Sequence, residues 1–229
     1  MTADAVVAAV SDAFEDCARR SIATRGRFAC AVAGGSVAER VCPVLAMKRL
    51  PWSAVDVFLA DERVVPLDDA ASNARAVRAA WIDPLGSSAP CFHEMPTGDA
   101  SLEQLATEAE RELLRVLGTP PVLDVVLLGV GPDGHVASLF PDHPLIGRRE
   151  AWVTAVDNAP KPPPRRLSLS LRTLAAGRSI WFIAFGPEKA AALREARTDP
   201  ASTLPVAVVA RSGPPVRWFL DDAADGARV

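Results

Sequence analysis

The segment 123–145, with the sequence LDVVLLGVGPDGHVASLFPDHPL, constrains the fold of this chain more than any other stretch. Its apolar run at 125–128 is typical of a parallel strand that is covered on both faces. Glycines and two ionisable residues follow the run at once: Gly129, Gly131, Asp133, Gly134 and His135. Because ligands of open parallel sheets bind beyond the carboxyl ends of the strands, we predict that His135 lies at a ligand-binding edge with a carboxylate beside it.

The same glycines match the dinucleotide-binding fingerprint G-x-G-x-x-G, and Asp157 lies at about the distance of its acidic residue. In that fingerprint a long helix begins at the third glycine. Here only residues 136–140 separate His135 from Pro141, and Pro144 follows closely, so a long helix has no room. We therefore predict that the segment does not bind a dinucleotide, and no cofactor is expected.

Length and composition favour one α/β domain that spans residues 1–229. Hydrophobic residues make up 49% of the chain, but no stretch approaches the ~18 continuous apolar residues of a membrane helix. A net charge of −3 argues against a nucleic-acid-binding protein, which normally carries a basic face. The acidic N-terminal segment lacks the basic start of a signal peptide. We therefore expect a cytoplasmic protein that binds neither nucleic acid nor membranes.

Apolar runs and helical periodicities alternate along the chain. Strands are predicted at 28–33, 55–60, 125–128, 152–156, 165–171, 180–185, 204–210 and 216–220. Helices are predicted at 4–20, 37–50, 72–81, 100–117 and 186–197. This alternation predicts a mostly parallel, Rossmann-like sheet with helices on both faces.

Two groups of residues are expected to take no part in the chemistry. Residues 86–99, rich in Ser, Pro and Gly, are predicted to form a surface loop in which His93 is exposed and inert. The four cysteines show no metal-ligand spacing with the histidines, so we predict free, mostly buried thiols and no metal site.

The glycine loop Gly34-Gly35-Ser36 follows the predicted strand at 28–33 and precedes the predicted helix at 37–50. Ser36 and Glu39 match a capping box, in which each side chain binds the backbone N–H group of the other. The two glycines would also let backbone N–H groups at the helix start close on an anion, which is how helix N-termini bind phosphate. The residues alone leave both interpretations open.

Polar groups follow three further predicted strands: Asp61-Glu62-Arg63, Asp133-Gly134-His135 and residues 186–189. Parallel strands would bring them to the same sheet edge as the glycine loop. Arg166 and Lys189 would then form an anion pocket, while His135, paired with Asp133 or Asp61, would be an acid–base centre. This arrangement predicts proton transfer or water activation on a phosphorylated small molecule.

Simpler interpretations of the same residues remain open. A solvated turn is the alternative for 61–63, and a plain Pro-Asp-Gly turn is the alternative for Asp133. A turn histidine that binds a local carbonyl is the alternative for His135. Arg165 and Arg166 are adjacent on a predicted strand and face opposite sides, so only one of them can enter a pocket.

The motifs resemble those of a known enzyme family. Residues 123–145 are very similar to a signature of the 6-phosphogluconolactonases, and VFLADERVVPLDDAASNARAV resembles their second signature. The segments AVAGGS, RRLSLSL, FGPEKAAAL and LPVAVV resemble the remaining blocks of the family, in the same order and over essentially the whole chain. The resemblance implies the fold of the related glucosamine-6-phosphate deaminases.

The resemblance also implies an activity, which is hydrolysis of 6-phospho-D-glucono-1,5-lactone to 6-phospho-D-gluconate in the oxidative pentose phosphate pathway, without a metal. It implies that His135 acts as general base on a water molecule, that Asp133 orients His135, and that Arg63 stabilises the developing oxyanion or the product carboxylate. Asp61 is the other carboxylate that the order of the strands places at this centre. The phosphate-binding residues that it implies are Gly34, Gly35, Ser36, Arg166 and Lys189. A monomer or small homo-oligomer is expected.

Two other functions remain as alternatives. A sugar-phosphate deaminase or isomerase would use the same scaffold, but deaminases carry a glutamate in the segment after the histidine, where this chain has VASLFP. A non-catalytic sugar-phosphate sensor would need a DNA-binding unit, for which the chain has neither the extra length nor a basic helix. The chain has Ser36-Val37-Ala38 where the family usually has Ser-Thr-Pro, so we expect an altered Michaelis constant rather than lost activity.

Overall fold

The computed structural model describes residues 1–147 and 150–226 and contains a six-stranded parallel sheet in the order β4-β2-β1-β5-β8-β9. The strands are β1 (Phe28–Val32), β2 (Val55–Leu59), β4 (Cys91–His93), β5 (Val125–Gly129), β8 (Ile180–Ala184) and β9 (Val216–Leu220). The interior strands β1, β5 and β8 are almost completely buried, which is why they appear as unbroken apolar runs in the sequence. The predicted parallel α/β fold is confirmed.

A second, three-stranded antiparallel sheet was not predicted. It has the order β3-β7-β6 and consists of β3 (Asp61–Arg63), β6 (Val153–Val156) and β7 (Arg166–Leu169). β3 begins two residues after β2 ends, so the chain passes directly from one sheet into the other. Three consecutive charged residues have low strand propensity, which is why 61–63 did not suggest a strand.

The helices cover the main sheet and fill the connections. The α-helices are α1 (Ala3–Arg25), α2 (Ser36–Arg40), α3 (Cys42–Ala46), α4 (Asn73–Val77), α5 (Leu102–Leu117), α6 (Leu171–Ala176), α7 (Ala190–Thr198), α8 (Pro205–Ser212) and α9 (Asp222–Asp225). Short 3₁₀ turns η1 (Trp52–Ala54), η3 (Asp83–Ser88), η4 (Pro144–Gly147) and η5 (Pro187–Lys189) and the π-helical turn η2 (Arg78–Ile82) complete the elements. In the part of the chain that the structure describes, no helix is both long and apolar enough to cross a membrane.

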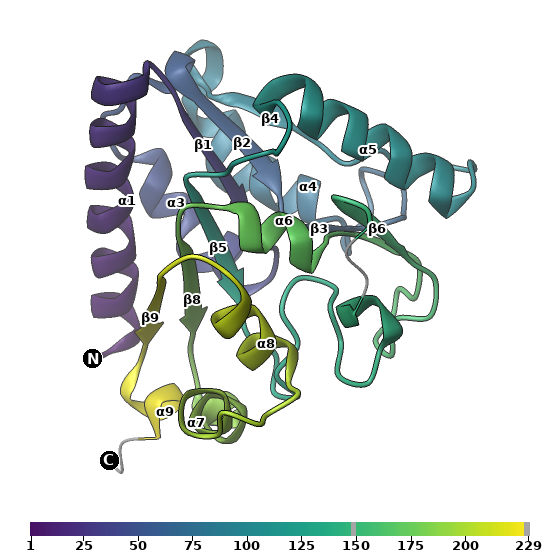
Figure 1. Cartoon of the computed structure of the whole chain (residues 1–229). Helices are drawn as coiled ribbons and strands as arrows, with labels where there is room; N and C mark the ends of the chain where they lie inside the picture. Colours follow the sequence, from purple (N-terminus) through teal and green to yellow (C-terminus); the bar gives the residue numbers. More distant parts are fainter. Residues whose placement is uncertain (148–149, 227–229) are drawn as a thin grey trace.

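The chain travels in two directions along the main sheet, and the direction changes between the neighbouring strands β1 and β5. From β1 it passes through β2 to β4, and from β5 through β8 to β9. Because parallel crossovers are right-handed, opposite directions place the connecting helices on opposite faces. Accordingly α1 contacts α3 whereas α6 contacts α8, and Figure 1 shows α1 beside the sheet and α6 and α8 in front of it. Open parallel sheets bind their ligands at such a switch point.

The larger of two hydrophobic clusters among the described residues contains side chains from both sheets. Phe14 of α1 packs edge-on against Phe28 of β1 and Trp81 of η2, with ring centroids 5.1 and 5.6 Å apart. Leu167 and Leu169 of the small sheet belong to the same buried cluster. The small sheet is therefore fixed against the main sheet by packing as well as by chain connection.

Three predictions of secondary structure were wrong. Residues 204–210 form most of helix α8 rather than a strand, because a short apolar run fits either structure and Pro205 occupies the first helical position. The predicted helix at 37–50 is divided into α2 and α3, with Pro43 in the first turn of α3. The predicted loop at 86–99 contains the edge strand β4.

Candidate functional site

The loops after β1 and β5 border a pocket of about 270 Å³ together with residues of the small sheet. Its lining includes eight of the nine predicted site residues, all except Asp133: Gly34, Gly35, Ser36, Asp61, Arg63, His135, Arg166 and Lys189. Asn73, Gly131 and Ala137 also line it. Larger cavities lie elsewhere on the surface, but the pocket at the switch point is the one that gathers these predicted residues.

His135 and Asp133 form a hydrogen-bonded pair at this pocket. Nδ1 of His135 lies 2.5 Å from Asp133 Oδ1, so the carboxylate accepts the Nδ1–H group and leaves Nε2 as the proton acceptor of the ring. Among the described residues Nε2 has no hydrogen-bond partner. Gly134, at φ 77°, turns the chain between the two residues, and its N–H group donates to the carbonyl of Gly131.

The pKa values of both His135 and Asp133 lie below their ordinary values. Burial lowers the pKa of His135 below its ordinary value, although the hydrogen bond and charge of Asp133 oppose this effect. For Asp133, partial burial alone raises the pKa, but hydrogen bonds and positive charge from His135 and Lys161 outweigh it and lower the pKa to about 2. At neutral pH the pair therefore consists of a neutral imidazole and a carboxylate.

Lys161 is a residue of the site that the sequence interpretation missed. It lies in the loop between β6 and β7, and its Nζ is 3.2 Å from Asp133 Oδ1 and from His135 Nδ1. The proline-rich stretch 158–164 lies between two predicted strands and shows no helix or strand pattern. The signal that was available is the rarity of lysine in this chain, which has three against 22 arginines, directly before three prolines.

The small sheet carries charged side chains of opposite sign side by side. In its register Asp61 pairs with Ser168 and Arg63 with Arg166, so these four residues share one face. Arg63 and Arg166 are like charges directly opposite each other, which is unfavourable unless an anion lies between or beside them. Asp61 supplies one such charge, with Oδ2 4.0 Å from Arg166 Nη1.

The two arginines differ in how many of their donors are already used. Arg166 is 3% exposed, and its Nε and Nη2 donate to the carbonyls of Pro163, Lys161 and Pro162 at 2.9, 2.9 and 3.3 Å. Arg63 donates through Nη1 to the carbonyl of Ala71, whereas its buried Nε has no partner among the described residues. A buried guanidinium N–H without an acceptor, beside a pocket, is suited to an anionic ligand.

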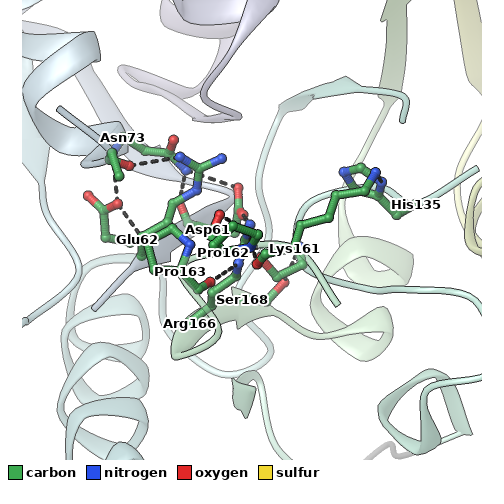
Figure 2. A network of polar contacts seen from close by, with 12 residues as sticks. Asp61, Glu62, Asn73, His135, Lys161, Pro162, Pro163, Arg166 and Ser168 are labelled. Carbon is green, nitrogen blue, oxygen red and sulfur yellow. Dashed lines mark hydrogen bonds and ion pairs between the residues drawn. The ribbon is translucent and has the colours of Figure 1, made fainter. Parts of the chain in front are cut away.

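Asp61 is not the partner of His135. It accepts hydrogen bonds from the Ser138 hydroxyl at 2.7 Å and the Asn73 amide at 3.3 Å, and Figure 2 shows it within the network of Asn73 and Arg166, away from His135. Of the two carboxylates considered from the sequence, Asp133 therefore pairs with the histidine.

Glu62 organises the backbone around these residues. Its fully buried carboxylate accepts the N–H groups of Arg63, Asn73 and Ala74, each at 2.7 Å, and thereby caps helix α4. Burial raises the pKa of Glu62 despite these hydrogen bonds. The alternative of a solvated turn at 61–63 is thus wrong, because the segment is a strand that positions its neighbours.

The glycine loop forms no capping box. Gly35, at φ 57°, precedes helix α2 without a side-chain cap, and the described hydrogen bonds include none from the Ser36 hydroxyl, which faces the pocket. A Cβ atom on Gly34 would lie 1.9 Å from Asn73 Oδ1, so the loop approaches the start of helix α4 too closely for any side chain. Val37 is fully buried and does not line the pocket, so a hydroxyl at this position would not reach a ligand there.

Lys189 lines the pocket from the segment that follows strand β8. It ends the turn η5, and its Nζ donates to the carbonyl of Phe185 at 2.7 Å and to Glu188 at 2.6 Å. The anion that was expected near this cation is therefore supplied in part by the neighbouring Glu188.

His93 was predicted to be exposed and inert, and the predicted exposure was wrong. It is 8% exposed, and its two ring nitrogens lie 2.9 Å from Asp56 and 2.8 Å from Glu112. Ligand atoms of Asp56, Cys91 and His93 lie within 4.8 Å of one another, although the sequence spacing suggested no metal set. Both nitrogens of His93 are already bonded to carboxylates, so this cluster is accounted for as an ion network. Of the four free cysteines, only Cys30 and Cys42 are buried.

Comparison with known proteins gives a consistent result. The family model described as glucosamine-6-phosphate isomerases/6-phosphogluconolactonase matches residues 1–218. A 6-phosphogluconolactonase from Rattus norvegicus is 38% identical over 211 residues, which cover 87% of this chain and 80% of that protein. The crystal structure of a 6-phosphogluconolactonase from Shewanella baltica superposes with a TM-score of 0.85 at 30% identity, covering 96% of this chain and 94% of that one. A monomeric glucosamine-6-phosphate deaminase, 16% identical with a TM-score of 0.79, shares the fold.

Proposed function

The chain belongs to the glucosamine-6-phosphate isomerase/6-phosphogluconolactonase family, and from this we propose that it hydrolyses 6-phospho-D-glucono-1,5-lactone to 6-phospho-D-gluconate in the pentose phosphate pathway. The observation that carries the proposal is the pairing of His135 with Asp133 beside a pocket that also contains three cationic side chains: Arg63, Arg166 and Lys189. A base for water and cations for a phosphorylated substrate are the two requirements of this reaction.

His135 acts as the general base in this proposal. Its Nε2 takes a proton from a water molecule whose oxygen forms a bond to the lactone carbonyl carbon. The bond from this carbon to the ring oxygen then breaks, and His135 returns the proton to that oxygen. Asp133 holds the tautomer by accepting Nδ1–H. General base catalysis of this kind contributes roughly 10²–10⁴-fold to the rate.

Charge stabilisation supplies the second part of the proposal. The unpartnered Nε of Arg63 supports its assignment to the oxyanion that develops on the carbonyl oxygen. The backbone of Gly34 and Gly35, the Ser36 hydroxyl, Nη1 of Arg166 and the Lys189 ammonium are assigned to the phosphate. Asp61, which pairs with Arg166 Nη1, is assigned to holding Arg166. All of these residues line the same pocket.

The test is lactone hydrolysis by the purified wild type and His135→Ala. The lactone is generated in place with glucose-6-phosphate dehydrogenase, and 6-phosphogluconate formation is followed above the spontaneous rate. We expect the acceleration by the wild type to fall at least 10²-fold in His135→Ala, and to be kept in the control His143→Gln, whose side chain does not line the pocket. Release of ammonia from glucosamine 6-phosphate, without lactone hydrolysis, would refute the proposal in favour of a deaminase.

The other expectations from the sequence belong to the same proposal. A protein of this function needs no macromolecular partner, and we propose a single catalytic domain that acts in the cytoplasm as a monomer or small homo-oligomer. Binding of sugar phosphates without turnover would instead support a sensor.

A further inference from the structure

The ammonium group of Lys161 lies against the polar atoms of both Asp133 and His135. Its Nζ is 3.1 Å from Asp133 Oδ2 and 3.2 Å from Asp133 Oδ1 and His135 Nδ1. Figure 2 shows this side chain extending from its loop toward His135. Three polar groups from two distant segments, 133–135 and 161, thus form one cluster.

Arg166 fixes the backbone from which Lys161 extends. Its guanidinium donates to the carbonyls of Lys161, Pro162 and Pro163 in succession. The proline rings restrict φ at two of these residues, so the loop has little freedom beyond the hydrogen bonds. The backbone at Lys161 is therefore held by the buried side chain of Arg166 in strand β7, although 42% of the Lys161 side chain is exposed.

We propose that Lys161 is a positioning residue of the proton-transfer group, which holds the Asp133 carboxylate toward the Nδ1–H group of His135 and disfavours a second proton on the imidazole. This inference rests on the proposed function, because it presupposes that His135 is the base. It also gives Arg166 a second task, since the same guanidinium that borders the pocket holds the loop of Lys161.

The donors and acceptors in this cluster support this role. Nζ of Lys161 and Nδ1–H of His135 are both donors, so they cannot bond each other and must share the Asp133 carboxylate. A cation 3.2 Å from the ring opposes the imidazolium form, whereas Asp133 favours it. Without Lys161 the Asp133 charge would act on His135 alone, and more of the base would be protonated near neutral pH.

The other charged groups around His135 do not replace Lys161 and Asp133 in setting the protonation of its imidazole. The pocket brings further charges from β3, from β7 and from the turn η5: Asp61, Arg63, Arg166 and Lys189. Asp61 favours the imidazolium form, but its carboxylate is engaged by Ser138 and Asn73. All of these groups remain in a variant of Lys161, so the change in titration of His135 isolates the effect of the lysine.

The experiment compares wild type, Lys161→Met and Lys161→Arg by NMR titration of the histidine ring and by the pH dependence of kcat/KM. The chain has only three histidines, so the His135 signals are assigned by their loss in His135→Ala. Lys48→Met is the matched control, because Lys48 pairs with Asp12 and Glu15 and does not line the pocket.

We expect the pKa of His135 to rise by about one unit in Lys161→Met, with the acidic limb of the kcat/KM profile moving to higher pH by the same amount. Lys161→Arg should restore the wild-type titration, and Lys48→Met should not change it. An active wild type with an unshifted Lys161→Met titration would overturn the inference and leave the proposed function intact. A higher KM without a shift would likewise overturn it in favour of substrate binding. An inactive wild type would refute the function itself.

Discussion

Gly131 lies so close to the Asp133–His135 pair that a methyl group on its Cα atom would displace the pair. A Cβ atom on Gly131 would lie 2.0 Å from His135 Nδ1, 2.1 Å from His135 Cε1 and 2.6 Å from Asp133 Oδ1. Non-bonded heavy atoms pack at roughly 3.5–4.0 Å, so the ring would have to retreat by about 1.5 Å. Gly131 does not have a positive φ, so the backbone itself accepts alanine and the effect is directed at the pair.

This displacement allows a magnitude to be assigned. A misplacement of about 1 Å costs roughly 10²-fold in rate, and complete loss of a general base costs about 10²–10⁴-fold. We therefore predict that Gly131→Ala lowers kcat by about 10²–10³-fold, which raises the activation free energy by ~2.7–4 kcal/mol. KM should change little, because the cations Arg63, Arg166 and Lys189 lie on other segments.

The assay is the lactone hydrolysis described above, with thermal unfolding of each variant measured in parallel. Gly177→Ala is the matched control, because a Cβ atom there would meet its nearest neighbours at an ordinary 3.4 Å and lies outside the pocket. A Gly131→Ala variant with the kcat of the wild type would refute the assignment of His135 and Asp133, in this geometry, to the chemical step.

Three further predictions address other parts of the molecule. Burial alone lowers the pKa of His93, but Asp56 and Glu112 raise it above its ordinary value. The charge of His93 therefore stabilises the fold fully below pH ~6.5, and this contribution is lost as the pH rises through the raised pKa. The difference in unfolding free energy between wild type and His93→Gln, measured by urea unfolding, should be about 1–3 kcal/mol at pH 6 and shrink toward pH 9. Val37→Thr buries a hydroxyl, so it should cost about 1–2 kcal/mol of stability and leave KM unchanged; a lowered KM would support the family's threonine as a ligand. Arg63→Met should lower kcat by roughly 10²-fold, and an unchanged kcat with raised KM would reassign Arg63 to phosphate binding.

The sequence allowed most strands of the main sheet and most of the candidate pocket residues to be predicted, because the strands and the loops that follow them leave local patterns. A buried parallel strand must be an unbroken apolar run, and a strand that ends in glycine must turn sharply, so the loops at 34–36 and 131–135 could be recognised one at a time. The parallel arrangement then brought them to one edge without any knowledge of long-range contacts.

The remainder of the site depends on contacts that have no local signal. The strand Asp61–Arg63 exists only because it pairs with residues more than a hundred positions away, and its charges hide that pairing. Lys161 reaches the Asp133–His135 pair through a loop held by Arg166, and the rarity of lysine marks the residue without indicating what it contacts. His93 lies on a strand too short to show a pattern, and its contact with Glu112 comes from a helix that begins nine residues later.

The wide sequence separation of the pocket residues ties activity to cooperative folding. The residues that line the pocket range from 33–36 to 189. The loops of the main sheet supply the histidine and the glycines, and the small sheet supplies the arginines. A partly folded chain that had formed the main sheet alone would hold the Asp133–His135 pair without the arginines of the small sheet. Turnover therefore reports on the completely assembled native state, and it is lost in any local opening that detaches the small sheet, even where most secondary structure persists.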